Sequence, residues 1–107
     1  MNNTYEAIQT TRAEIDSLAE PVLIEFGTAW CGHCMAAQPL IESALNKYPA
    51  LRHLMVEDGP GRPLGRSFRV KLWPTLIFMA HGREVARVVR PEDVGEISSA
   101  LRQIADP

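Results

Sequence analysis

The hydrophobic positions of the chain fall into segments with the spacing of strands and segments with the spacing of helices. Residues 22–26 are nearly continuous in apolar character, which is typical of a central strand covered on both faces. Residues 32–48 repeat apolar side chains at helical spacing. A further apolar strand is predicted over residues 75–79, and an amphipathic helix over residues 92–104. The most clearly patterned segments therefore alternate between strand and helix.

Shorter segments complete this pattern. Thr11 and Glu14 match a capping box, which predicts a short helix over residues 11–19. The remaining expected elements are an edge strand over residues 5–9, a strand over 51–56, a brief helix over 64–68, and a strand over 84–89 that follows a hairpin turn at His81-Gly82. Together these elements predict an α/β domain, in which a mixed central sheet of about five strands is covered by helices on both faces.

Composition narrows the class of protein. The chain has 107 residues, of which 46% are hydrophobic, so we expect a single globular domain over residues 1–107. A formal net charge of −2 gives no reason to expect nucleic acid or a membrane surface as a partner. No secretory leader is visible after Met1, and we therefore expect a cytoplasmic protein.

Cys31 and Cys34 are the only cysteines, and they carry the strongest chemical signal in the chain. Residues three positions apart share one side of a helical turn, so the two sulfurs can form a disulfide with little backbone movement. Because it closes so short a loop, that disulfide is a weak staple but an easily cycled redox couple. Two other interpretations stay open, an inert buried pair and a zinc site completed by His53 and His81.

Several motifs together resemble the thioredoxin family over essentially the whole chain. They are Ile24-Glu25-Phe26, Trp30-Cys31-Gly32-His33-Cys34, Pro39 in the following helix, Trp73-Pro74-Thr75 at the start of the next strand, and Gly82 in the hairpin. The resemblance implies a thioredoxin fold and thiol–disulfide exchange on protein substrates, with no cofactor, because the dithiol itself carries both electrons. The Gly32-His33 pair is of the kind found in protein disulfide isomerases, which leaves a more oxidising oxidase or isomerase as an alternative.

The resemblance also implies catalytic roles. Cys31, at the start of a helix, would be the nucleophilic thiolate, and Cys34 the thiol that resolves the mixed disulfide. Glu25, a lone charge in an apolar strand, would take the proton from Cys34 through a water. His33 would stabilise the Cys31 thiolate and so make the disulfide a stronger oxidant. Pro74 would be a cis-proline that faces the cysteines.

Substrate contacts are expected around the cysteines. Trp30 would shield the disulfide and offer an apolar surface to which Gly32 also belongs. The backbone of Trp73 would pair with an extended peptide, and Thr75, two residues further on, is also expected to contact the substrate. Trp73 and Arg90 depart from the smaller residues usual in the family, so they add aromatic bulk and a cation to the substrate groove.

Each of these roles has a plainer alternative. Glu25 could reach solvent at the end of its strand or pair with a cation, and His33 could simply cap the first helical turn. Pro74 could form a trans turn, and Trp30 could fill the core. The arginines at positions 62, 66 and 69 are expected on a solvated helix face.

The expected partners follow from the same resemblance. They are protein disulfide substrates and a flavoprotein reductase as electron donor, and the chain is expected to be a monomer. Gly27 stands where thioredoxins usually place a bulky aromatic residue, and Met35 replaces a frequent lysine. Because Trp73 and Arg90 alter the groove, a binding module with incidental redox activity is the rival from another class.

Overall fold

The computed structural model describes residues 4–7 and 10–106, and this part of the chain contains four helices and four strands. The elements in chain order are α1 (Arg12–Asp16), β1 (Val22–Gly27), α2 (Gly32–Leu45), β2 (Arg52–Glu57), α3 (Pro63–Ser67), β3 (Thr75–Ala80), β4 (Arg83–Val89) and α4 (Val94–Arg102). Each predicted helix is present, and so is each predicted strand except the first. None of the helices in the described ranges is long and apolar enough to cross a membrane.

The strands form one mixed sheet in the order β2-β1-β3-β4. β1 is parallel to β2 and antiparallel to β3, and β3 is antiparallel to β4. The expected fifth strand at the N-terminus is reduced to one parallel bridge between Glu6 and Val56, with residues 8–9 outside the described part. Backbone bonds of 3.0 Å from the Glu6 amide to the Met55 carbonyl and 2.9 Å from the Glu57 amide to the Glu6 carbonyl fix this segment beside β2.

Helix α1 begins as predicted but is shorter. Thr11 caps it through the expected capping box with Glu14, yet the helix ends at Asp16 rather than near residue 19. The β3–β4 hairpin explains this end, because a Cβ on Gly82 would lie 2.3 Å from the Asp16 carbonyl oxygen. Gly82 also has a positive φ of 75°, as the tight hairpin turn requires.

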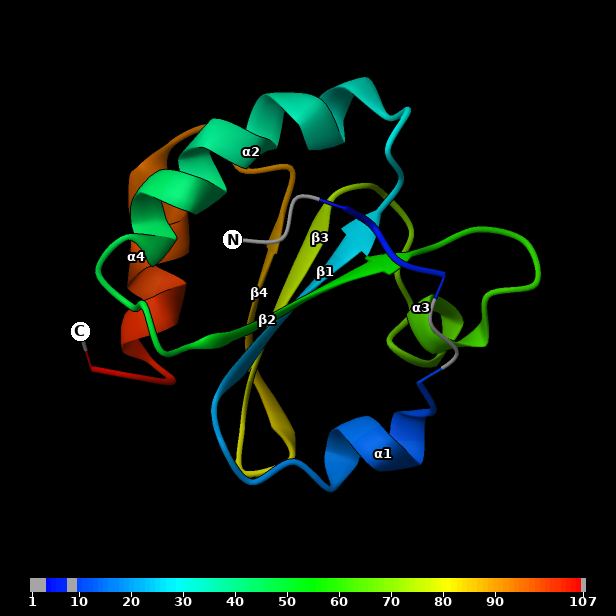
Figure 1. Cartoon of the computed structure of the whole chain (residues 1–107), viewed down its shortest axis with the longest axis horizontal. Coiled ribbons are helices and arrows are strands. Elements are labelled where there is room, and N and C mark those ends of the chain that lie inside the picture. Colours follow the sequence, from blue (N-terminus) through cyan, green and yellow to red (C-terminus); the bar gives the residue numbers. More distant parts are fainter. Residues whose placement is uncertain (1–3, 8–9, 107) are drawn as a thin grey trace.

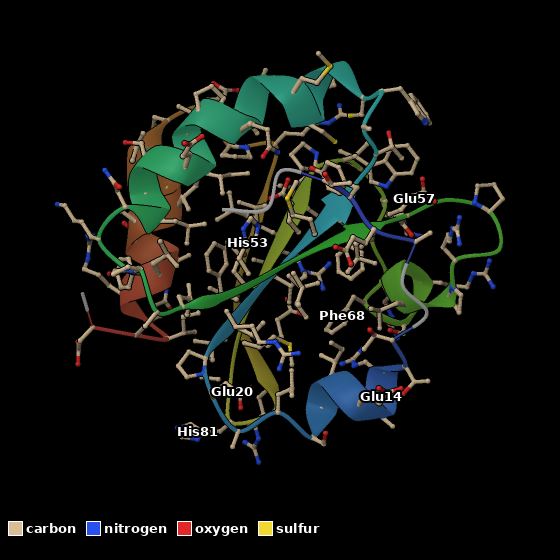
Figure 2. All side chains as sticks on the ribbon, in the orientation of Figure 1. Glu14, Glu20, His53, Glu57, Phe68 and His81 are labelled. Atoms are coloured by element: carbon tan, nitrogen blue, oxygen red, sulfur yellow. The ribbon has the colours of Figure 1, made fainter. Side chains whose placement is uncertain are left out.

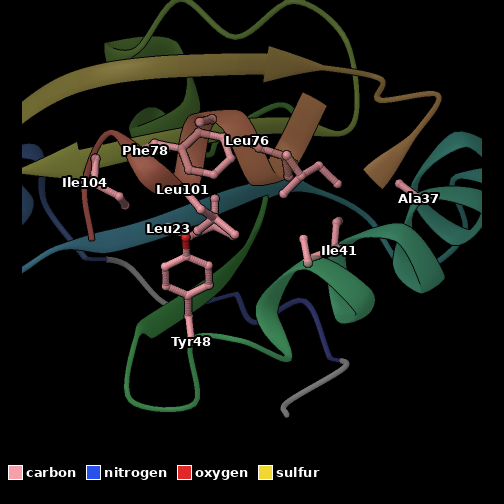
Figure 3. Close-up of a cluster of buried hydrophobic side chains, with 11 residues drawn as sticks. Leu23, Ala37, Ile41, Tyr48, Leu76, Phe78, Leu101 and Ile104 are labelled. Atoms are coloured by element: carbon pink, nitrogen blue, oxygen red, sulfur yellow. The ribbon is translucent and has the colours of Figure 1, made fainter. Parts of the chain in front are cut away.

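The helices cover both faces of the sheet, α2 and α4 on one and α1 and α3 on the other (Figure 1). Alternate residues of β1 point to opposite faces. Leu23 packs into the core beneath α2 and α4, together with Ile41, Phe78 and Leu101 (Figure 3). The neighbouring residues of β1, Val22, Ile24 and Phe26, pack into the second core against α1 and α3.

This alternation places Glu25 on the same face as Leu23, underneath α2. Its side chain is completely buried in an otherwise apolar strand. Residue 27 ends β1, and the chain then leads directly into α2. The fold thus places a buried carboxylate immediately behind the start of a helix.

Candidate active site

Cys31 is the N-cap of α2, the longest helix of the described chain. Its backbone is extended, with φ −80° and ψ 120°, and its sulfur accepts a hydrogen bond of 3.2 Å from the Cys34 backbone amide. The start of a helix presents unpaired amides and the positive end of the helix dipole, an environment that attracts negative charge. Both cysteines are free thiols, and Cys31 is 8% exposed, whereas Cys34 is 1% exposed.

Cys34 lies one turn into α2 with its thiol held in the protonated form. Burial of the sulfur, followed by a hydrogen bond with Cys31, raises the pKa of the Cys34 thiol from 9.0 to about 12. Hydrogen bonds from the Thr28 backbone and the Tyr5 side chain lower this pKa only in part. At neutral pH the thiol form therefore predominates over the thiolate. Cys34 needs a proton acceptor before it can act as a nucleophile.

Gly27 allows the sulfur of Cys34 to sit directly against β1. A Cβ at position 27 would lie 2.6 Å from the Cys34 sulfur and 2.9 Å from the Tyr5 hydroxyl oxygen. Both distances are shorter than side-chain packing allows, so a larger residue would displace one of the two groups. The absence of the aromatic residue expected here thus has a physical reason in this chain.

The carboxylate of Glu25 is surrounded by three polar side chains. The Tyr5 hydroxyl donates a hydrogen bond to Oε2, and Gln38 Nε2 donates to the same oxygen at 2.7 Å. His53 Nε2 lies 2.9 Å from Oε1. Because Glu25 is completely buried, it does not reach solvent at the end of its strand, and a buried carboxylate needs partners of this kind. The alternative that Glu25 pairs with a cation remains open only for His53, and only if the imidazole is protonated.

The sequence reasoning missed Tyr5 and Gln38, and it considered His53 only as a zinc ligand and not as a partner of Glu25. Gln38 follows Cys34 by one helical turn, so helical spacing could have identified it. His53 is opposite Leu23 in the parallel pairing of β1 with β2, and Leu23 shares a face with Glu25. That register, like the long-range contact of Tyr5, leaves no local signal in the sequence.

The zinc interpretation gains no support from the geometry. His53 lies beneath α2, whereas His81 lies at the far end of the sheet in the β3–β4 turn (Figure 2). Within residues 4–7 and 10–106, no three His, Cys, Asp or Glu side chains are grouped to hold a metal ion. His53 instead belongs to the shell around Glu25.

The outward side of the cysteines is aromatic. Trp30 is 75% exposed, so the interpretation of this residue as core filling is wrong. Its ring meets that of Trp73 edge-on, with centroids 5.6 Å apart and an interplanar angle of 78°. The Trp73 indole N–H donates to Asp58 Oδ2 at 2.9 Å, which anchors the pair.

The peptide bond between Trp73 and Pro74 is cis, as the resemblance implied. Phe26 pairs with Thr75 across β1 and β3, so the proline lies at the end of the sheet from which the chain enters α2. The Trp73 carbonyl, expected to face substrate, already accepts a hydrogen bond of 2.8 Å from Arg90 Nε. The Arg90 backbone amide donates to the Pro74 carbonyl at 3.0 Å. Arg90 therefore braces the proline loop.

Three further expected site residues differ in their surroundings. Thr75 is buried, and its hydroxyl donates to the Leu72 carbonyl at 2.6 Å, so its side chain holds the loop rather than facing a substrate. Gly32 is exposed, and a Cβ there would meet no atom within 4 Å. His33 is exposed on the first turn of α2, where the sulfur of Cys31, not the imidazole, makes the capping bond.

One reachable thiol at a helix start, with a second thiol behind it, has the arrangement required for disulfide exchange. The family model for thioredoxin matches residues 5–103. Thioredoxin 2 of Pseudomonas aeruginosa PAO1, solved in its reduced form, is 56% identical, with a TM-score of 0.87 over 97% of this chain and 96% of that one. Thioredoxin-1 of Saccharomyces cerevisiae is 32% identical over 82 residues, which cover 74% of this chain and 80% of the relative. The chain belongs to the thioredoxin family.

A thioredoxin H-type protein of Picea mariana extends the likeness, at 31% identity over 94% of this chain and 75% of the relative. The protein is thus a thiol–disulfide oxidoreductase with a thioredoxin fold, and its substrates are protein disulfides. The predicted fold and activity are confirmed, with four strands in the described part of the chain where about five were expected.

Proposed function

We propose that Cys31 is the attacking thiolate and Cys34 the resolving thiol. The Cys31 sulfur attacks one sulfur of a substrate disulfide, forms a mixed disulfide and expels the other substrate sulfur as a thiolate. The Cys34 sulfur then attacks Cys31, so a Cys31–Cys34 disulfide forms and the substrate leaves with both electrons. The observation that carries this assignment is the N-cap position of Cys31, where the Cys34 backbone amide donates a hydrogen bond to its sulfur.

The proposed proton acceptor for Cys34 is Glu25. Burial of the carboxylate on the face beneath α2 and its proximity to Gly27 support this role. Its three polar partners keep the carboxylate oriented without supplying a fixed charge from Lys or Arg. A carboxylate so placed can take the proton that Cys34 must lose during resolution.

We also propose that substrates dock on the aromatic side of the cysteines. The exposed ring of Trp30, the open surface at Gly32 and the edge-on ring of Trp73 would contact the partner protein. Pro74 and Arg90 would shape this surface, since the Arg90 guanidinium and amide brace the loop around the cis bond. The side chain of Thr75 contributes from within by fixing the same loop.

The direction of exchange is a separate proposal. We infer net reduction of substrates in the cytoplasm by a monomer, with a flavoprotein reductase restoring the dithiol. The exposed imidazole of His33 at the helix start favours a second candidate, an oxidase or isomerase, because it can stabilise the Cys31 thiolate and make the disulfide more oxidising. The reduction potential measured against glutathione decides between the two directions.

Cysteine variants test the assignment of roles with insulin as the protein substrate. Cys31→Ser should reduce turnover at least roughly a thousand-fold, because the nucleophile is removed. Cys34→Ser should still attack, so it should accumulate a mixed disulfide that non-reducing electrophoresis detects. A Cys31→Ser variant that keeps its turnover, or a mixed disulfide trapped at Cys34 instead, would contradict the assignment.

A further inference from the structure

The hydroxyl of Tyr5 lies between the sulfur of Cys34 and the carboxylate of Glu25. It donates a hydrogen bond to Glu25 Oε2, and it lies close enough to the Cys34 sulfur to affect the pKa of that thiol. The Cys34 sulfur and the Tyr5 oxygen converge on one point above Gly27, at 2.6 Å and 2.9 Å from the place a Cβ would occupy. One hydroxyl is therefore adjacent to both the proton donor and the proton acceptor of the resolving step.

This contact changes the expected path of the proton. The sequence predicted that Glu25 takes the proton from Cys34 through a water. In the structure the tyrosine hydroxyl occupies that intermediate position. The backbone beside it is fixed by the bridge between the next residue, Glu6, and Val56 of β2. A hydroxyl that accepts with its oxygen while donating its own hydrogen can do what the water would do.

We propose that the Tyr5 hydroxyl is the proton relay between Cys34 and Glu25, an inference that rests on the proposed role of Glu25. The Cys34 proton passes to the Tyr5 oxygen while the Tyr5 proton passes to Glu25 Oε2. The Cys34 sulfur forms its bond to Cys31 as the bond from Cys31 to the substrate sulfur breaks, and the substrate leaves as a thiolate with the electron pair. Tyr5 is neutral before and after the step, and Glu25 ends protonated.

The surroundings of Tyr5 favour passing a proton over losing one. Burial, followed by the negative charge of Glu25 and the hydrogen bond to it, raises the pKa of Tyr5 well above its ordinary range. The tyrosinate form of Tyr5 is therefore disfavoured. A transfer in which both protons move together does not pass through a tyrosinate. After the transfer the two hydrogen bonds of the relay are reversed, so that Glu25 donates to Tyr5 and Tyr5 donates to the Cys34 sulfur.

Two more side chains hold the relay in place. Gln38 Nε2 lies 2.7 Å from Glu25 Oε2, 3.4 Å from the Tyr5 oxygen and 3.2 Å from the Cys34 carbonyl. It therefore contacts all three members of the path. His53 occupies the other carboxylate oxygen, which leaves Oε2 as the oxygen that receives the proton. Gln38 and His53 are positioning residues in this scheme.

The test separates the attack of Cys31 from the resolution by Cys34. Reduced protein is mixed in a stopped-flow instrument with an equimolar aromatic disulfide that releases a coloured thiolate. The first phase reports attack by Cys31, and the second reports release by Cys34. Tyr5→Phe should leave the first phase unchanged and slow the second roughly ten- to hundred-fold near neutral pH. The deficit should shrink as pH rises, because hydroxide can then take the proton directly.

Tyr48→Phe is the matched control, since it removes a tyrosine hydroxyl from the core beneath α2 and α4. Both of its phases should match those of the wild type. Glu25→Gln should slow the second phase as Tyr5→Phe does, and the double variant should be little slower than either, because both act on one step. A wild-type rate in Tyr5→Phe beside a slow Glu25→Gln would overturn the relay and leave the proposed function intact.

Other outcomes bear on both proposals. If both single variants resolve at the wild-type rate, the role of Glu25 fails and the relay fails with it. If Tyr5→Phe does not fold, the wild-type protein alone can still test the relay. The rate of its second phase is then measured in mixtures of light and heavy water. Two protons moving in one step give a curved dependence on the deuterium fraction, whereas a straight line contradicts the relay.

Discussion

Behind the cysteine pair, Glu25 is completely buried among Tyr5, Gln38 and His53, whereas in front of it Trp30 is largely exposed beside Trp73. The buried side is polar and fits so closely that a Cβ at position 27 would lie within 3 Å of both the Cys34 sulfur and the Tyr5 hydroxyl oxygen. The front side is aromatic and open. Proton handling requires fixed partners shielded from water, and docking requires accessible surface, so the two requirements produce opposite kinds of packing.

This contrast leads to a division of effects. Changes behind the cysteines should alter the resolving step for every substrate, together with the stability of the fold. Changes in front should alter the affinity for protein substrates and leave the exchange chemistry intact. The predictions below test that division, beginning with the tightest contact in the site.

Gly27→Ala should produce the largest effect. The new methyl group would meet the Cys34 sulfur at 2.6 Å and the Tyr5 hydroxyl at 2.9 Å. Overpacking of this kind costs about 1–3 kcal/mol, so the urea midpoint of the reduced protein should fall. Displacement of Tyr5 or Cys34 should also slow the second stopped-flow phase.

Gly32→Ala is the control for stability, because its added methyl group meets no atom within 4 Å. Its urea midpoint should stay at or above that of the wild type, since alanine is the better helix former. Equal midpoints for Gly27→Ala and the wild type would show that the buried side repacks freely, and the contrast between the two sides would be lost.

The same contrast explains what the sequence could predict. Local patterns identify three site residues, a short motif for Cys31 and Cys34 and an apolar strand for the buried Glu25. The structure places these residues together. Tyr5 and His53 reach Glu25 across the sheet, and local spacing does not encode such contacts.

Two further predictions differ from the structure. Helix α1 stops early because the β3–β4 hairpin abuts its last turn, and the His81 amide donates to the Ala19 carbonyl at 3.3 Å. Thr75 was placed at the substrate surface, but its hydroxyl is engaged by the Leu72 carbonyl. A tertiary contact decided the first outcome and a local loop bond the second, while strand and helix periodicity correctly predicted the layers.

A second prediction concerns alkaline pH. The unfolded chain begins to lose the Cys34 proton above pH 9, whereas the folded chain holds it until about pH 12. The unfolded state then binds fewer protons, so the free energy of unfolding should fall through this window, by up to about 1.4 kcal/mol per pH unit. Tyr5 acts in the same direction from about pH 10, because its pKa is also raised on folding. Urea midpoints measured across the window check the slope.

Two controls isolate the thiol. Cys34→Ala removes the titrating group and should flatten part of the slope, and oxidation of the wild type to the Cys31–Cys34 disulfide should do the same. An identical slope in all three proteins would mean that folding does not raise the pKa of the Cys34 thiol.

The smallest expected effect belongs to the exposed side. Trp30→Ala should raise KM for a protein disulfide by roughly five-fold, about 1 kcal/mol of binding, and leave kcat unchanged. The urea midpoint should hardly move, because the ring is 75% exposed. Val85→Ala, at an exposed apolar position on β4, is the matched control and should change neither constant. If Trp30→Ala lowered kcat instead, the aromatic side would take part in the chemistry, and the division between docking in front and proton transfer behind would not hold.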